Sequence, residues 1–106
     1  MLNINDFQAI CQIKNIVVTH HAMKRFNERG IDIDDIVHTI QTGEIIQQYI
    51  NDKPFPSCLI LGKSCKENKM HIVASKDETH IYLITTYYPN ADEWEDDFKT
   101  RKGRKP

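Results

Sequence analysis

The segment from Thr19 to Ile31, THHAMKRFNERGI, holds the side chains best suited to chemistry. On a helix that turns about 100° per residue, His21, Arg25 and Arg29 form one stripe beside the apolar edge. A histidine can move protons near neutral pH, and the planar guanidinium of arginine matches the oxygens of a phosphate. The stripe therefore indicates an anion site, or else arginines that pair with acidic residues such as Glu44 or Asp32 while their stems cover the core.

A second set of candidate groups lies nearer the C-terminus, in the strand-like stretch HIYLITTYY. Strict alternation places four of its residues on one face, Ile81, Leu83, Thr85 and Tyr87. This face changes from apolar to hydroxyl-bearing, as happens where a core opens into a cleft. His71 lies in the preceding strand-like run, and a short hairpin would bring it within reach of Thr85 or Tyr87. A strand histidine of this kind can equally be a structural residue that only makes hydrogen bonds.

Together these groups suit acid–base cleavage of a phosphodiester without a metal ion. His21 or His71 would move the proton, and the two arginines of the stripe would stabilise charge on the phosphoryl oxygens. Thr85 and Tyr87 would orient the phosphate or assist proton transfer. The residues thus predict a phosphodiester site built from a helix and two neighbouring strands.

A metal or cofactor site is not indicated. The carboxylates lie in 32–35 and 92–97, where helix dipoles and solvent explain them. His20 and His21 are adjacent and point to different sides of a helix, so they cannot chelate one ion. Motifs such as GxGxxG, a P-loop, GxSxG and HExxH are absent. We therefore expect no metal ion and no cofactor.

Local signals predict the elements that must position these groups. The first part of the chain has helical periodicity and predicts three helices: one capped by Asn5 or Asp6, one from the N-cap Thr19 through Arg29, and one from Asp32 to Gly43. Residues 44–88 contain four strand-like runs, EIIQQYI, SCLILGK, MHIVAS and HIYLITTYY, joined by short polar connectors. Sequential antiparallel pairing is the simplest topology.

The segment ADEWEDDFK predicts a terminal helix that docks through Trp94 and Phe98. The predicted fold class is therefore α+β, with N-terminal helices packed on a curved four-stranded antiparallel meander and a short C-terminal helix after it.

Length and charge limit the architecture and the partners. The chain has 106 residues, 40% hydrophobic and 27% charged, as is typical of one globular domain. Its net charge is −1, but five of the 14 basic residues lie in the last eight positions, so residues 1–98 hold nine basic against 15 acidic groups. We expect one domain over 1–98 and a basic, disordered tail over 99–106.

The sequence also bears on the compartment. It has no apolar run long enough to span a membrane and no recognisable signal peptide. Its three cysteines match neither a zinc pattern nor an even disulfide framework. We therefore expect a cytoplasmic protein with reduced thiols and no membrane partner.

Several spaced blocks resemble the bacterial domain family of unknown function DUF4258. The first block is His-Ala-x-x-Arg-x-x-x-Arg-Gly-Ile, followed by Gly-x-x-x-x-x-Tyr, a histidine-bearing strand, and Ile-Thr-x-Tyr-x-Pro before a tryptophan-bearing tail. The residues that match these blocks are His21, Ala22, Arg25, Arg29, Gly30, Ile31, Gly43, Tyr49, His71, Thr85, Tyr87, Pro89 and Trp94.

This resemblance implies a compact fold similar to that of RelE-type toxins and related metal-independent endoribonucleases. It implies a candidate site of His21, Arg25, His71, Thr85 and Tyr87. The partners it implies are RNA as substrate and, if the chain is the toxin half of a toxin–antitoxin pair, an antitoxin protein.

RelE-like toxins are commonly basic, whereas residues 1–98 are acidic. We therefore expect RNA binding to rely on the cationic stripe and the tail, and to weaken steeply with salt. Two alternatives remain open. One is a module that binds a protein partner through a sheet edge or the Trp94 region, and the other is a domain that binds a small anion or nucleotide beside His21 and Arg25.

Overall fold

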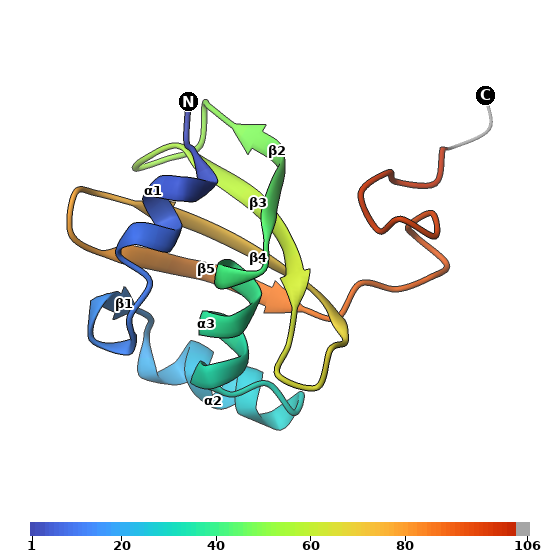
Figure 1. Ribbon diagram of the computed structural model, residues 1–106, viewed down its shortest axis with the longest axis horizontal. Helices are drawn as coiled ribbons and strands as arrows, with labels where there is room; N and C mark the ends of the chain where they lie inside the picture. Colours follow the sequence, from blue (N-terminus) through green and yellow to red (C-terminus); the bar gives the residue numbers. More distant parts are fainter. Residues whose placement is uncertain (104–106) are drawn as a thin grey trace.

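The computed structural model describes residues 1–103, which form an open five-stranded sheet and three α-helices. Figure 1 shows α1 and α3 lying across the front of the sheet. The elements in chain order are α1 (Ile4–Ala9), a 3-10 turn (Ile13–Asn15), β1 (Ile16–Val17), α2 (His20–Glu28), α3 (Ile33–Gln41), β2 (Glu44–Tyr49), β3 (Ser57–Lys63), β4 (Lys69–Lys76) and β5 (Ile81–Tyr87). The mixed α+β class is as predicted.

Each α-helix begins directly after a residue whose side chain caps it by accepting a backbone hydrogen bond. The hydroxyl of Thr19 accepts a hydrogen bond from the backbone N–H of Ala22, and Asp32 and Asp35 form a reciprocal capping box at the start of α3. Asn3, rather than Asn5 or Asp6, caps α1. Local chemistry thus sets the start of α2, the helix that carries the predicted cationic stripe.

The strand order is β1-β5-β4-β3-β2, with β1 parallel to β5 and the other neighbours antiparallel. The prediction of four strands is wrong by one. Ile16 and Val17 pair with Ile81 and Tyr82 and add a fifth strand. Two residues are too few to show a period of two, so the sequence pattern does not reveal this strand.

A β-bulge in β5 overturns the predicted alternation. The register passes from Ala74 opposite Leu83 to Val73 opposite Thr85, so Ile84 is an extra residue. Leu83 therefore belongs to the core beneath the helices, whereas Thr85 lies on the other face. The prediction that Leu83 and Thr85 share a face is wrong, because strict alternation holds only while the pairing register is unbroken.

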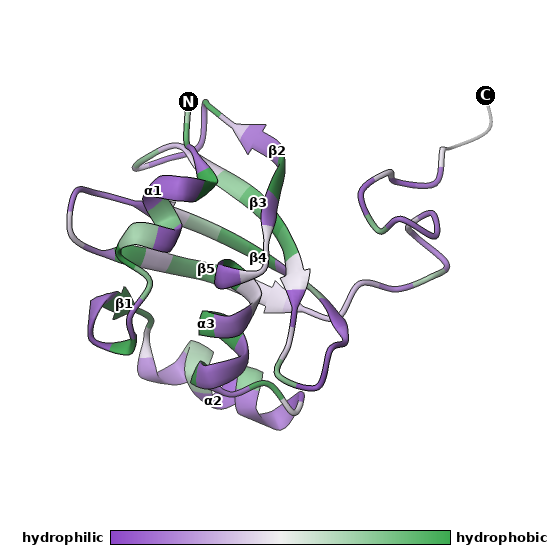
Figure 2. Ribbon diagram, in the orientation of Figure 1, coloured by the Kyte–Doolittle hydropathy of each residue, from purple (hydrophilic) through white to green (hydrophobic). Residues whose placement is uncertain are grey.

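The helix-facing side of the sheet carries the main core. Its buried residues come from the helices and from alternate positions of β3, β4 and β5, as in Phe7, Ile36, Ile60 and Ile72. α3 lies so close to β3 that a Cβ on Gly62 would stand 2.0 Å from the backbone oxygen of Thr39. Figure 2 shows β5 changing from hydrophobic to nearly neutral towards its C-terminal arrowhead. Within residues 1–103, no helix is long and apolar enough to cross a membrane.

The predicted C-terminal helix does not form. Residues 90–102, here called the C-terminal strap, make turns and one isolated bridge between Trp94 and Arg101. The carboxylate of Asp97 accepts hydrogen bonds from the backbone N–H groups of Lys99 and Thr100. Short side chains of this kind favour turns over helix because they bond to the nearby backbone.

The beginning of the predicted disordered tail makes defined contacts. Lys99 forms an ion pair with Glu44 at 3.0 Å, and the Arg101 guanidinium lies 4.9 Å from the centre of the Trp94 ring. The prediction of disorder over 104–106 lies outside the described residues.

Candidate functional site

His71 and Tyr87 meet on the sheet face opposite the helices. They are direct cross-strand partners in β4 and β5, and neighbours in such a pair project to the same face. His71 Nδ1 lies 3.3 Å from the Tyr87 hydroxyl oxygen, and the two rings pack edge to face with centroids 5.3 Å apart. The expected proximity of the histidine to this tyrosine is therefore found.

The second ring nitrogen of His71 decides its tautomer. Nε2 lies 2.8 Å from the backbone oxygen of Phe98. A carbonyl only accepts, so Nε2 carries the proton and donates it. The unprotonated Nδ1 of the neutral ring then accepts a hydrogen bond from the Tyr87 hydroxyl. Both nitrogens are engaged, and the side chain has no exposed surface.

The environment keeps both side chains neutral. Burial lowers the pKa of His71 below its ordinary value, the bond to the Phe98 carbonyl opposes this, and the cation of Arg101 lowers the pKa further. Burial raises the pKa of Tyr87, which is half-buried. At neutral pH the pair is therefore an imidazole that accepts a proton and a phenol that donates one.

The C-terminal strap covers this pair. Trp94 is 4% exposed and packs edge to face on His71, with ring centroids 4.5 Å apart. The strap also contacts the sheet at Glu44, and cross-strand pairs link Glu44 through Leu61 and His71 to Tyr87 in one row. The strap thus crosses the sheet along that row and leaves Tyr87 as the partly accessible member of the pair.

Arg29 joins helix α2 to the same strand. Its Nη1 donates a hydrogen bond of 3.2 Å to the backbone oxygen of Thr86, and the Thr86 hydroxyl donates one of 2.9 Å to the backbone oxygen of His71. The guanidinium therefore reaches the strand edge between Thr85 and Tyr87. The suggested pairing of an arginine with Glu44 is not what the structure shows, because Glu44 pairs with Lys99.

The remaining stripe residues are exposed. Arg25 lies one helical turn before Arg29, and residues with that spacing are neighbours on a helix surface; His21 lies one turn earlier still. Both side chains are exposed. Within residues 1–103, no hydrogen bond or ion pair connects them to His71 or Tyr87.

The structure thus links three of the six predicted residues in one network: Arg29, His71 and Tyr87. Thr85 lies on the same sheet face and is half-buried. Four contributors were not predicted as site residues: Thr86, Trp94, Phe98 through its carbonyl, and Arg101. Trp94 was the only one with a usable signal, as the single tryptophan beside the basic segment.

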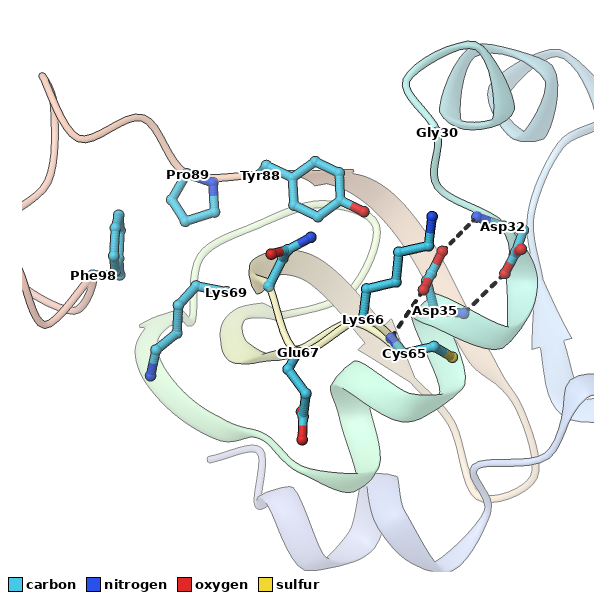
Figure 3. Close-up of a pocket in the computed structure, with 11 residues that line it drawn as sticks. Gly30, Asp32, Asp35, Cys65, Lys66, Glu67, Lys69, Tyr88, Pro89 and Phe98 are labelled. Atoms are coloured by element: carbon cyan, nitrogen blue, oxygen red, sulfur yellow. Dashed lines mark hydrogen bonds between the residues drawn. The ribbon is translucent and has the colours of Figure 1, made fainter.

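A hollow of about 690 Å³ lies at the end of the sheet next to Gly30, the β3–β4 turn and Phe98. Figure 3 shows the Asp35 carboxylate at one side of the hollow beside Asp32 and Cys65, with Lys66 extending towards Asp32 and Asp35. Asp35 accepts hydrogen bonds from the backbone N–H groups of Asp32 and Cys65, at 3.1 and 3.0 Å.

Burial raises the pKa of Asp35, but these hydrogen bonds and the nearby lysine outweigh it and lower the pKa overall. Asp32, Asp35 and Glu67 outnumber the two lysines that line the hollow. The acidic groups suit anchoring of the turn better than binding of a phosphate. Among the residues that the structure describes, no group of three or more His, Cys, Asp or Glu side chains is placed to hold a metal ion.

Comparison with known proteins places the chain in a family. The family model described as "Domain of unknown function (DUF4258)" matches residues 18–88. The chain belongs to the DUF4258 family. No curated protein and no solved structure matches it. The DUF4258 match runs from the start of α2 to the end of β5, so it spans all six predicted site residues and ends before the C-terminal strap.

Proposed function

We propose that this DUF4258 protein is a metal-independent endoribonuclease with a RelE-like fold. The observation that carries the proposal is the bond from Arg29 to the Thr86 carbonyl. It brings Arg29, the last residue of the α2 stripe, to the edge of the strand that bears Thr85 and Tyr87, and His71 lies in the next strand. An imidazole and a phenol can move protons and guanidinium groups can stabilise phosphoryl charge, which are the two kinds of assistance that speed transesterification of RNA.

In the proposed reaction, Tyr87 contacts the RNA and His71 acts through it. The ribose 2′-hydroxyl gives its proton to the Tyr87 oxygen as the phenol proton passes to His71 Nδ1. The 2′-oxygen then attacks the phosphorus, and the bond to the 5′-oxygen breaks. The departing 5′-oxygen takes a proton from the exposed imidazolium of His21. The products are a cyclic phosphate and a free 5′-hydroxyl.

The other residues stabilise charge and position. Arg25 and Arg29 bind the non-bridging oxygens, where negative charge develops as the 2′-oxygen attacks. Thr85 orients the phosphate by a hydrogen bond. The Phe98 carbonyl accepts from Nε2–H in both protonation states of His71, so it favours the imidazolium that forms. His71 is thus a positioning and proton-accepting residue, whereas Tyr87 touches the substrate.

The charge of the chain is consistent with a local site and not with a broad RNA surface. Residues 1–98 are acidic, so the attraction for RNA comes from the α2 stripe and the basic C-terminal residues. We propose that binding is salt-sensitive for this reason. As the toxin half of a toxin–antitoxin pair, the protein would be held inactive in the cytoplasm by an antitoxin.

The proposal is tested by incubating the purified chain with end-labelled RNA in EDTA and identifying the ends of the products. Cyclic phosphate and 5′-hydroxyl ends are expected, together with growth arrest on expression in bacteria. Cleavage that EDTA abolishes, or no cleavage of any of a large set of RNAs, would contradict the mechanism. Harmless expression with a co-purifying partner would favour the protein-interaction module.

A further inference from the structure

A second hollow lies on the same sheet face as Tyr87. Its volume is about 410 Å³. Residues 52–55, from the loop between β2 and β3, form one side, and Ser75, Tyr82 and Ile84 line the rest. Ser75 is the cross-strand partner of Tyr82. The hollow is of the size of small-molecule sites in proteins.

Ser75 supplies a polar group at this hollow that is not satisfied within the protein. Its side chain is 4% exposed, and its Oγ is the one buried side-chain oxygen or nitrogen in residues 1–103 without a hydrogen-bond partner. Buried hydroxyls are nearly always bonded, and each exception calls for an explanation. The oxygen itself is enclosed, so a turn of the Ser75 side chain would present it to a ligand that offers a hydrogen-bonding edge inside the hollow.

The remaining walls are mostly apolar, although Asp52 and Lys53 also line the hollow. Phe55 is 56% exposed and Ile84 48% exposed, although both are large hydrophobic residues. The Tyr82 hydroxyl donates a hydrogen bond of 2.5 Å to the Asp77 carboxylate, which fixes the ring. Asp52 is engaged by the Ser57 hydroxyl and the Lys53 backbone N–H. The hollow thus suits a neutral planar ring with polar atoms on its edge.

The position of the hollow indicates which planar ring it takes. Ile84 directly precedes Thr85 on β5, and Thr85 and Tyr87 belong to the proposed cleavage site. We infer that the hollow binds a nucleobase of the RNA strand whose phosphate lies at Tyr87. Phe55 and Tyr82 contact the base through their rings, as aromatic side chains do in single-strand RNA recognition, and Ser75 bonds to its edge. This inference rests on the proposed function and adds a base-binding subsite to it.

The test uses the four free ribonucleosides as probes and follows the backbone amides by NMR. A nucleoside carries a base but no phosphate, so it reports on the hollow without the arginine stripe, and it cannot be cleaved. We expect at least one nucleoside to cause saturable shifts confined to residues around the hollow. Phe55→Ala should weaken binding at least about fivefold, and Ser75→Ala about two- to tenfold.

Two features keep the variants interpretable. Ile13→Ala is the matched control for Phe55→Ala, because Ile13 is 54% exposed and lies outside the hollow; it should leave binding unchanged. Ser75→Ala should be as stable as the wild type or more stable, because it removes a buried hydroxyl that has no partner.

The outcomes separate the subsite from the enzyme. If no nucleoside binds saturably, or if Phe55→Ala binds as the wild type does, the inference is overturned even where RNA is cleaved. A co-purifying protein chain seated at Phe55 would also overturn it. Nucleoside binding that follows the expected pattern in a protein that cleaves no RNA would support the base site and overturn the proposed function.

Discussion

His71 and Tyr87 face each other across β4 and β5. The histidine Nδ1 accepts a hydrogen bond from the Tyr87 hydroxyl, with 3.3 Å between the nitrogen and the oxygen. The opposite nitrogen of the same ring donates to the Phe98 carbonyl. These two hydrogen bonds fix a neutral His71 with its proton on Nε2. The pair lies beneath the C-terminal strap and beside the strand edge that Arg29 reaches.

The first prediction concerns stability and pH. Burial keeps the pKa of His71 in the folded state below its unfolded value of about 6.5. At pH values just below 6.5, His71 therefore binds a proton in the unfolded chain but stays neutral in the folded chain. The free energy of unfolding should therefore fall as the pH drops from 7 to 5.

Urea denaturation at several pH values measures this effect. The His71→Gln variant should lose up to about 1.4 kcal/mol per pH unit of that slope. Asp77 and Asp97, whose carboxylates have lowered pKa values because they accept hydrogen bonds, lose their contribution only below about pH 4. Equal slopes for the wild type and the variant between pH 5 and 7 would refute the buried, neutral His71.

The second prediction concerns the strap. Trp94→Ala removes the ring that excludes water from His71, so the pKa of His71, followed by NMR titration, should rise towards its ordinary value. Arg101→Ala should also raise it, because this cation lowers the pKa. Lys102→Ala, in the exposed neighbouring residue, is the control and should leave it unchanged. An unaltered pKa in Trp94→Ala would mean that the strap does not shield the histidine.

The third prediction concerns the stripe on α2. Arg25→Ala should lower the rate of RNA cleavage about 10²-fold, as removal of a group that stabilises transition-state charge does. Because Arg25 is exposed, its loss should leave the thermal midpoint unchanged.

Arg29→Ala should lower cleavage similarly. It should also lower the free energy of unfolding by about 0.5–1.5 kcal/mol, because the bond to the Thr86 carbonyl is lost. Lys24→Ala, an exposed cation on the opposite side of α2, serves as the control for both variants. A loss of activity in Lys24→Ala as large as that in Arg25→Ala would indicate general attraction of RNA in place of a phosphate site.

The fourth prediction concerns the packing of α3 on β3. Gly62→Ala should lower the free energy of unfolding by about 3 kcal/mol, the upper end of the usual cost of overpacking, because the new Cβ would clash with the backbone of Thr39. Gly30→Ala provides a comparison at a site with open space but a φ of +77°. Its cost should be about 1–2 kcal/mol. Chemical denaturation that finds Gly62→Ala as stable as the wild type would contradict the close contact.

How far the sequence predicts the fold depends on whether the deciding contacts are local. Thr19 and Asp32 start their helices through bonds three residues away, so these starts are readable from the sequence. β1 depends on pairing with a strand 65 positions later (Ile16 opposite Ile81), and the bulge at Ile84 depends on register with β4. Neither has a local pattern.

The same distinction holds at the site. A short hairpin brings His71 to Tyr87, and the sequence predicts this. The cover over His71 comes from Trp94 and Phe98, which lie in turns and not in the predicted helix. An irregular segment carries no periodicity, so the burial of His71, and with it the role of Tyr87 as the accessible group, could be found only from the structure.

The most direct test of the proposed enzyme compares RNA cleavage in EDTA by the wild type, Tyr87→Phe and Tyr88→Phe. Tyr88 is the adjacent tyrosine and lies outside the proposed machinery, so Tyr88→Phe controls for the loss of a hydroxyl. We predict cleavage by the wild type and by Tyr88→Phe, and a rate about 10²-fold lower for Tyr87→Phe, which cannot exchange a proton. Equal rates for Tyr87→Phe and the wild type, or no cleavage by the wild type, would contradict the account.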